Sequence, residues 1–166
     1  MIRKEQFLNF YKEIVTSTEV LLRHVPAEKV DWRPVESFFT LGQLMAHMVI
    51  STRVYADGVT DGSWGFTAMR AVLVTNRRTP PMDPPTAIER LTENAEYFTR
   101  RLSLLSEQDF EQGEVFAPQF NGPAPRWRLA LLAAEHQINH KAELFMSLRV
   151  LKINVHTGHL YQLQRP

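Results

Sequence analysis

Two histidines stand four residues apart in the sequence EHQINHKAEL, residues 135–144. In a helix, His136 and His140 lie one turn apart on the same face, so both imidazoles can reach one ion at about 2.0–2.1 Å. Leu129 and Leu144 fall on or beside that face, which places both imidazoles inward among apolar residues. Because burying an unpartnered polar group is costly, the pair needs hydrogen bonds or a metal. The spacing therefore indicates either a metal site or an inward polar pair that serves structure.

A third histidine, His47, lies inside another expected helix, in LGQLMAHMVISTRVY, and shares its face with Leu44, Ile50 and Val54. It completes a three-histidine set, a donor set that leaves one coordination position open. Three neutral imidazoles and a divalent ion form a Lewis-acidic centre that can lower the pKa of a bound water or thiol. The alternative is that the three histidines are hydrogen-bonded core residues and that no ion binds.

Glu143 follows His140 by three residues and shares its face. It can act as a hydrogen-bond acceptor behind a ligand, as an extra ligand or as a base, or it can form a salt bridge at the rim of a bundle. Glu135 points about a quarter-turn away and is expected at the surface. HQINH is not the HExxH zinc motif, because it lacks the glutamate that serves as general base.

The remaining three histidines carry weaker signals. His24 ends the first expected helix, where a cation is favoured by the helix dipole. His156 and His159 lie in the C-terminal tail, where solvent or an interface is the expected environment.

The composition indicates one domain, residues 1–166, of ordinary globular character. The chain contains no cysteine, so it has no disulfide, no zinc–thiolate site and no thiol nucleophile of its own. Its 19 basic and 18 acidic residues argue against a nucleic-acid partner. No apolar run is long enough to span a membrane, and the N-terminus lacks the apolar core of a signal peptide. The expected location is the cytoplasm.

Apolar residues at three- and four-residue spacing must supply the elements that position the histidines. They predict helices over residues 3–25, 40–56, 86–105 and 126–151. Two capping boxes support the starts of the middle helices, Thr40 with Gln43 and Thr86 with Glu89.

Three other stretches are expected to be loops or irregular: residues 57–66, 106–125 and 154–166. Residues 66–76 are a short helical turn or have no regular structure. The only strand candidate is RAVLVTNR, residues 70–77, which is too isolated to build a sheet. The pattern therefore predicts an all-α protein, a four-helix bundle.

At these residues the chain resembles the DinB-like (damage-inducible) family. VPAEKVDWRPVESFFTLGQLMAHMV is similar to the family's first half, where a proline-containing connection precedes a helix that opens with Ser/Thr-Leu and carries a histidine about two turns in. AAEHQINHKAELFMSLRVLKI is similar to its last helix, in which a histidine pair is followed by Arg-Gly-Gln and later by Leu-Arg, here Leu148-Arg149. The two segments and the helix order cover most of the chain.

The resemblance implies an up-down-down-up four-helix bundle, usually a homodimer. It also implies a divalent metal, often nickel or zinc, at the positions matching His47, His136 and His140. Several relatives that act with bacillithiol, mycothiol or glutathione are metal-dependent thiol transferases or isomerases, in which the ion activates the thiolate. The family name reflects induction by DNA damage and implies no DNA binding.

The chain departs from the family pattern after His140, where Lys141-Ala142-Glu143 replaces Arg-Gly-Gln. The glutamate adds a charge beside the expected metal, and lysine lacks the bidentate fork of arginine. No specific thiol cofactor therefore carries over from the family.

The first functional hypothesis is a metal-dependent S-transferase or hydrolase that acts on small molecules, with Glu143 orienting a ligand or accepting a proton. A thiol must come from a low-molecular-weight cosubstrate, since the chain has none. Loops 58–66 and 106–125 could wall the pocket. Their aromatic residues, and one just beyond, could line it or simply pack: Trp64, Phe66, Phe116 and Trp127. The rival hypothesis is a non-enzymatic stress-response protein that binds a metal or small ligand.

Overall fold

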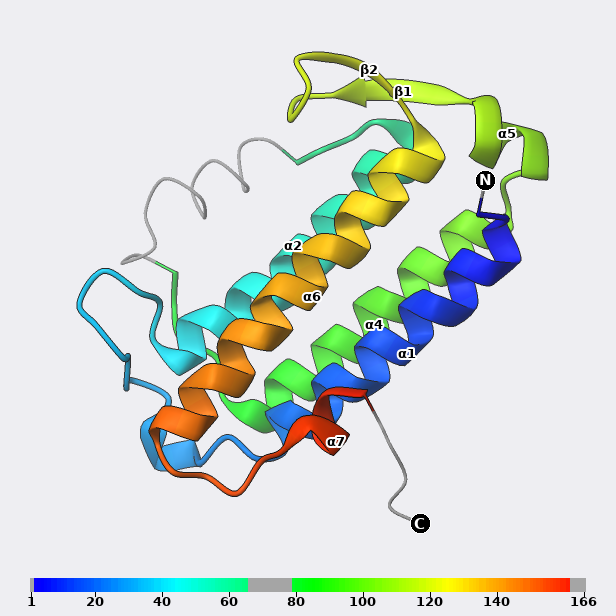
Figure 1. The fold of residues 1–166 in the computed structure, drawn as a ribbon. Coiled ribbons are helices and arrows are strands. Elements are labelled where there is room, and N and C mark those ends of the chain that lie inside the picture. The colour runs from blue at the N-terminus through cyan, green and yellow to red at the C-terminus, as the bar shows by residue number, and fades with distance from the viewer. Residues whose placement is uncertain (1, 66–78, 162–166) are drawn as a thin grey trace.

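Four long helices form the body of the protein in a computed structural model that describes residues 2–65 and 79–161. They are α1 (Lys4–Leu22), α2 (Leu41–Asp61), α4 (Pro84–Ser103) and α6 (Arg126–Val150). Both α1 and α2 pack against α4 and against α6. Figure 1 shows α1 and α6 running in one direction and α2 and α4 in the other. This arrangement confirms the predicted all-α bundle with up-down-down-up topology.

Hydrogen bonds between α2 and α4 demonstrate that these two helices are parallel. Asn94 Nδ2 donates to Val49 O at 3.0 Å, and further along both helices Arg101 donates to Asp61 at 2.6 Å. Parallel neighbours cannot be joined by a tight turn, which is why a long connection, residues 62–83, separates α2 from α4.

The start of α2 is fixed by the predicted capping box. Thr40 Oγ1 accepts a hydrogen bond from Gln43 N at 3.2 Å, and Gln43 Oε1 accepts one from Thr40 N at 3.0 Å. The helix then continues past the expected end at residue 56 to Asp61, where Gly62 adopts a left-handed φ of 79°. The capping box therefore defines the register of the helix that carries His47.

The predicted capping box of Thr86 and Glu89 is wrong. The N-cap of α4 is Asp83, whose carboxylate accepts a hydrogen bond from Thr86 N at 3.0 Å. Pro84 and Pro85 occupy the first turn of α4. Backbone N–H groups in the first turn form no hydrogen bond within the helix, so proline, which lacks this group, causes no loss there. The proline pair therefore begins this helix.

The segment 106–125, predicted as an unstructured connection, contains three short elements. They are α5 (Glu107–Gln112) and an antiparallel hairpin of β1 (Glu114–Ala117) and β2 (Gly122–Pro125). The prediction that this segment contains no strand is therefore wrong. Strands of four residues show too little alternation to be recognised in the sequence. In Figure 1 the hairpin lies over the end of the bundle where α6 begins.

The C-terminal tail, predicted to be irregular, forms the short helix α7 (Thr157–Tyr161), which packs against α1 and α6. A 3-10 turn, η1 (Ala27–Lys29), follows α1. The strand candidate at 70–77, the undecided stretch 66–76 and Phe66 lie outside the described residues. Among the helices that the structure describes, none is both long and apolar enough to cross a membrane.

Candidate metal centre

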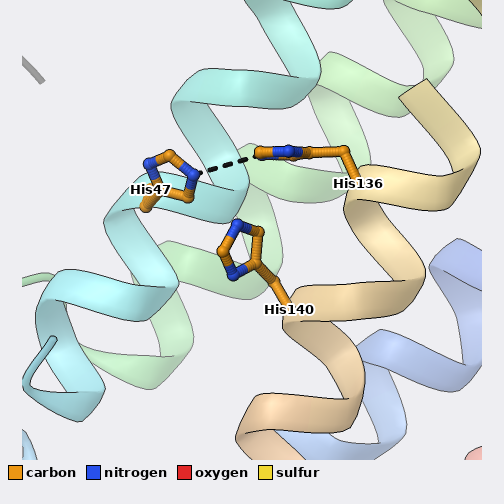
Figure 2. A group of neighbouring side chains, drawn as sticks. All are labelled: His47, His136 and His140. Atoms are coloured by element: carbon orange, nitrogen blue, oxygen red, sulfur yellow. Dashed lines mark hydrogen bonds between the residues drawn. The ribbon is translucent and has the colours of Figure 1, made fainter. Parts of the chain in front are cut away.

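The fold brings the three predicted histidines together. His47 comes from α2, and His136 and His140 come from successive turns of α6. One ring nitrogen of each lies within 4.8 Å of the other two, and Figure 2 shows the three rings turned toward one another. The Nε2 atoms of His47 and His136 are 3.1 Å apart. The convergence expected from the sequence is therefore present.

The separation of these nitrogens suits a shared ion. Two nitrogens bound to one ion at about 2.0–2.1 Å, at angles of about 90–109°, lie about 2.9–3.4 Å apart. The observed 3.1 Å between the Nε2 atoms falls in that range and also fits a single imidazole–imidazole hydrogen bond. The ring of His140 lies 4.6 Å from each of the other two rings, centroid to centroid. The third imidazole at this distance completes a group of three that could hold one ion.

Glu143 fixes the orientation of His140. Its Oε2 atom lies 3.0 Å from Nδ1 of His140, one turn earlier on α6. With the proton on Nδ1, the imidazole donates to the carboxylate and keeps its lone pair on Nε2. Glu143 is thus placed behind the cluster as an acceptor. Glu135 is exposed on the same helix, as the sequence predicts.

Burial keeps two of the imidazoles neutral. Desolvation, followed by repulsion from His140, lowers the pKa of His47 to about 4, while Glu143 opposes this shift. Desolvation, followed by repulsion from His140 and His47, lowers the pKa of His136 to about 3. Neutral imidazoles carry the lone pairs that a metal ion requires, so near pH 7 His47 and His136 can act as donors.

Two aromatic rings that the sequence analysis missed flank the cluster. Phe39 stacks on His47, with ring centroids 5.1 Å apart, and Tyr55 contacts His136 at 5.3 Å. Tyr55 follows His47 by eight residues, about two turns of α2, and this spacing could have identified it. Phe39 precedes the helix, and no periodic signal points to it.

Trp64 packs against the ring of Tyr55. The two rings meet edge to face at 5.8 Å, and the indole N–H donates to Phe116 O on β1 at 2.7 Å. A side chain at Gly58 would overlap the indole, so glycine permits the close packing of Trp64 on α2. Trp64 therefore connects the hairpin to the ring that contacts His136.

Among the described residues, the aromatic candidates named from the sequence make no ring contact with the three histidines. Trp64 itself is 2% exposed and packs in the core, whereas Phe116 is 55% exposed on β1. Trp127 is half-buried against the core. The packing alternative therefore describes Trp64 and Trp127 better than the pocket-lining one.

The remaining histidines form a separate group where α7 packs against α1. Nδ1 of His24 lies 2.7 Å from Val20 O, and its ring lies 4.8 Å from that of His159. The rings of His156 and His159 are 3.9 Å apart, and both residues are half-buried within the chain. None of the three joins the cluster of Figure 2.

The model of the DinB superfamily matches residues 12–144 of the chain. Among solved structures, the chain is similar to a DinB-like protein from Bacillus subtilis, with 18% identity, a TM-score of 0.68, and coverage of 90% of this chain and 94% of that one. It is also similar to a DinB-like protein from Bacillus cereus, with 18% identity, a TM-score of 0.71, and coverage of 92% and 95%. At this level of identity the likeness concerns the fold. A search of curated proteins gave no match.

Proposed function

This chain belongs to the DinB superfamily, and we propose that it is a metal-dependent enzyme that transfers a thiol to, or hydrolyses, a small molecule. His47, His136 and His140 hold the ion in this proposal. The observation that carries it is the approach of three imidazoles from two helices, with nitrogens close enough to share one ion. Imidazole donors suit zinc and nickel, which are the ions we propose.

A bound zinc or nickel ion supplies Lewis acidity, which lowers the pKa of a thiol or water. The chain supplies the surroundings for that chemistry. The carboxylate of Glu143 accepts a hydrogen bond from Nδ1–H of His140. This contact keeps the proton on Nδ1 and orients the ring. Phe39 and Tyr55 pack against the other two rings and limit their movement.

The thiol must be a separate small molecule, because the chain contains no cysteine. In the transfer reaction the thiol loses its proton, its sulfur forms a bond to an electrophilic carbon, and the leaving group departs with the bonding electron pair. The proton acceptor we propose is Glu143, whose carboxylate lies 3.0 Å from Nδ1 of His140.

Metal content per chain, measured by elemental mass spectrometry on tag-free protein, tests the donor set. About one ion per chain is expected for the wild type and almost none for His47→Ala. His24→Ala is the matched control, because its histidine lies outside the cluster, and it should retain the ion. The proposal fails if no ion binds after incubation with zinc and nickel, or if His47→Ala retains it.

Turnover of a generic electrophile with several low-molecular-weight thiols tests the enzymatic part. His136→Ala should abolish turnover while circular dichroism shows an intact fold. Activity that survives this substitution would contradict the mechanism. Stoichiometric metal binding with no turnover would favour a non-enzymatic metal- or ligand-binding protein.

A further inference from the structure

Lys141 is a buried cation beside the histidine cluster that the proposed chemistry does not use. It follows His140 directly, but a step of about 100° around the helix turns its side chain toward α1 and α7. The residue is 7% exposed, and its Nζ atom donates to Ser17 Oγ and to Leu160 O, both at 2.9 Å. The hydroxyl of Ser17 gives its own proton to Ile14 O, so it acts toward lysine only as an acceptor.

Both hydrogen-bond acceptors of this ammonium group are neutral, the hydroxyl of Ser17 and the backbone carbonyl of Leu160. The ion pairs found among the described residues do not include Lys141. Buried charges are normally paired, and an ammonium group has three protons to donate, of which two are accounted for.

The ammonium group lies at a cavity of about 520 Å³ between α1, α6 and α7. This volume lies within the range of about 300–1,000 Å³ that small-molecule pockets occupy. The cavity has a polar part and a larger apolar part, and its walls include Ser17, Lys141, Ile14, Ile138, Leu160 and Tyr161. The ring of Tyr161 lies 6.0 Å from Nζ of Lys141 and is 67% exposed. A cation at one side of an apolar cavity suits a ligand with one charged end.

We propose that this cavity is a second ligand site, distinct from the histidine cluster, which binds an organic monoanion. The carboxylate of the ligand accepts the third proton of Lys141, and its apolar body lies against Tyr161, Leu160 and Ile14. A single charge is favoured because one lysine can balance only one negative charge.

Phenylacetate tests this site, with phenylacetamide as the neutral ligand of nearly the same shape. Each is titrated into the full-length protein while backbone amide shifts are followed by NMR. Phenylacetate should bind at least about tenfold more tightly than the amide, a difference of about 1.4 kcal/mol. The amides of Ser17 and Leu160 should shift during the titration.

Two variants separate the possible causes of binding. Lys141→Met retains an apolar side chain of similar length and should weaken phenylacetate binding at least about tenfold. His136→Ala disables the histidine cluster and should leave phenylacetate binding unchanged, so this test is independent of the proposed metal function.

The site does not exist as proposed if phenylacetate and phenylacetamide bind alike, or if neither binds. It is also overturned if Lys141→Met, with an intact fold by circular dichroism, binds phenylacetate as the wild type does. Loss of binding in His136→Ala would assign the anion to the histidine cluster and would overturn the second site as well.

Discussion

The Nε2 atoms of His47 and His136 lie 3.1 Å apart, although 89 positions separate the two residues in the sequence. Each ring is held from outside the cluster, His47 by the face of Phe39 and His136 by Tyr55. Two imidazoles fixed on separate helices at this distance form a donor pair that exists only in the folded chain. Anything that binds the pair should therefore stabilise the fold.

Zinc should raise the melting temperature of metal-free protein. At a free zinc concentration of about 100 times Kd, binding adds about 2.7 kcal/mol to the free energy of unfolding. Differential scanning calorimetry measures the change, and His136→Ala should abolish it. Magnesium is the control ion, since it prefers oxygen ligands and should have no effect. An equal rise with magnesium, or in His136→Ala, would show that the cluster is not the binding site.

Glu143→Ala should weaken metal binding about 10- to 100-fold, because His140 loses the acceptor that orients its ring. Competition with a chromogenic chelator gives the affinity. Glu135→Ala is the matched control, since it removes an exposed carboxylate from the same helix, and it should bind within a fewfold of wild type. Equal losses in the two variants would mean that net charge, and not the contact with His140, governs affinity.

Gly58→Ala should destabilise the protein by about 1–3 kcal/mol, because the new methyl group overlaps the indole of Trp64. In an unobstructed helix the same substitution stabilises by about 0.5–1 kcal/mol. Urea unfolding of a double-mutant cycle with Trp64→Leu separates the two effects. The alanine should become neutral or stabilising once the indole is removed. If it destabilises both backgrounds equally, the packing of Trp64 on α2 is not the cause.

Thr40→Ala should lower the free energy of unfolding by about 1 kcal/mol, because Gln43 N loses the side-chain acceptor that caps α2. Thr40→Ser retains a hydroxyl and should lose less than half as much. Both values come from chemical denaturation. If serine is as damaging as alanine, the lost contribution is the packing of the threonine methyl group and not the cap.

Much of the site was predictable because its parts are local. The spacing of His136 and His140 places both on the same face of α6, one turn apart, and Glu143 lies about one turn further along. The capping box at Thr40 set the register of α2, and the apolar pattern set the inward direction of His47. The roles of these residues as ligands and base stay predictions.

Errors arose where a residue type permits two structures. A proline pair can break a helix or begin one, and the hydrogen bond of Asp83 to Thr86 N decides that Pro84 begins α4. The glycines of DGVTDG suggested a loop, yet Gly58 lies inside α2. The residue is glycine because the indole of Trp64 occupies the place of a side chain. In the first case a local cap made the choice, and in the second the glycine is required by a contact with Trp64.

The sequence by itself determined the class of fold, the histidine pair and the inward face of each long helix, because these depend on residues three and four positions apart. Only the tertiary structure decided that His47 meets that pair, that Tyr55 and Phe39 flank it, and that Lys141 turns to a different cavity. The physical reason is that contacts between helices depend on how all the apolar faces pack at once. No local spacing contains that information.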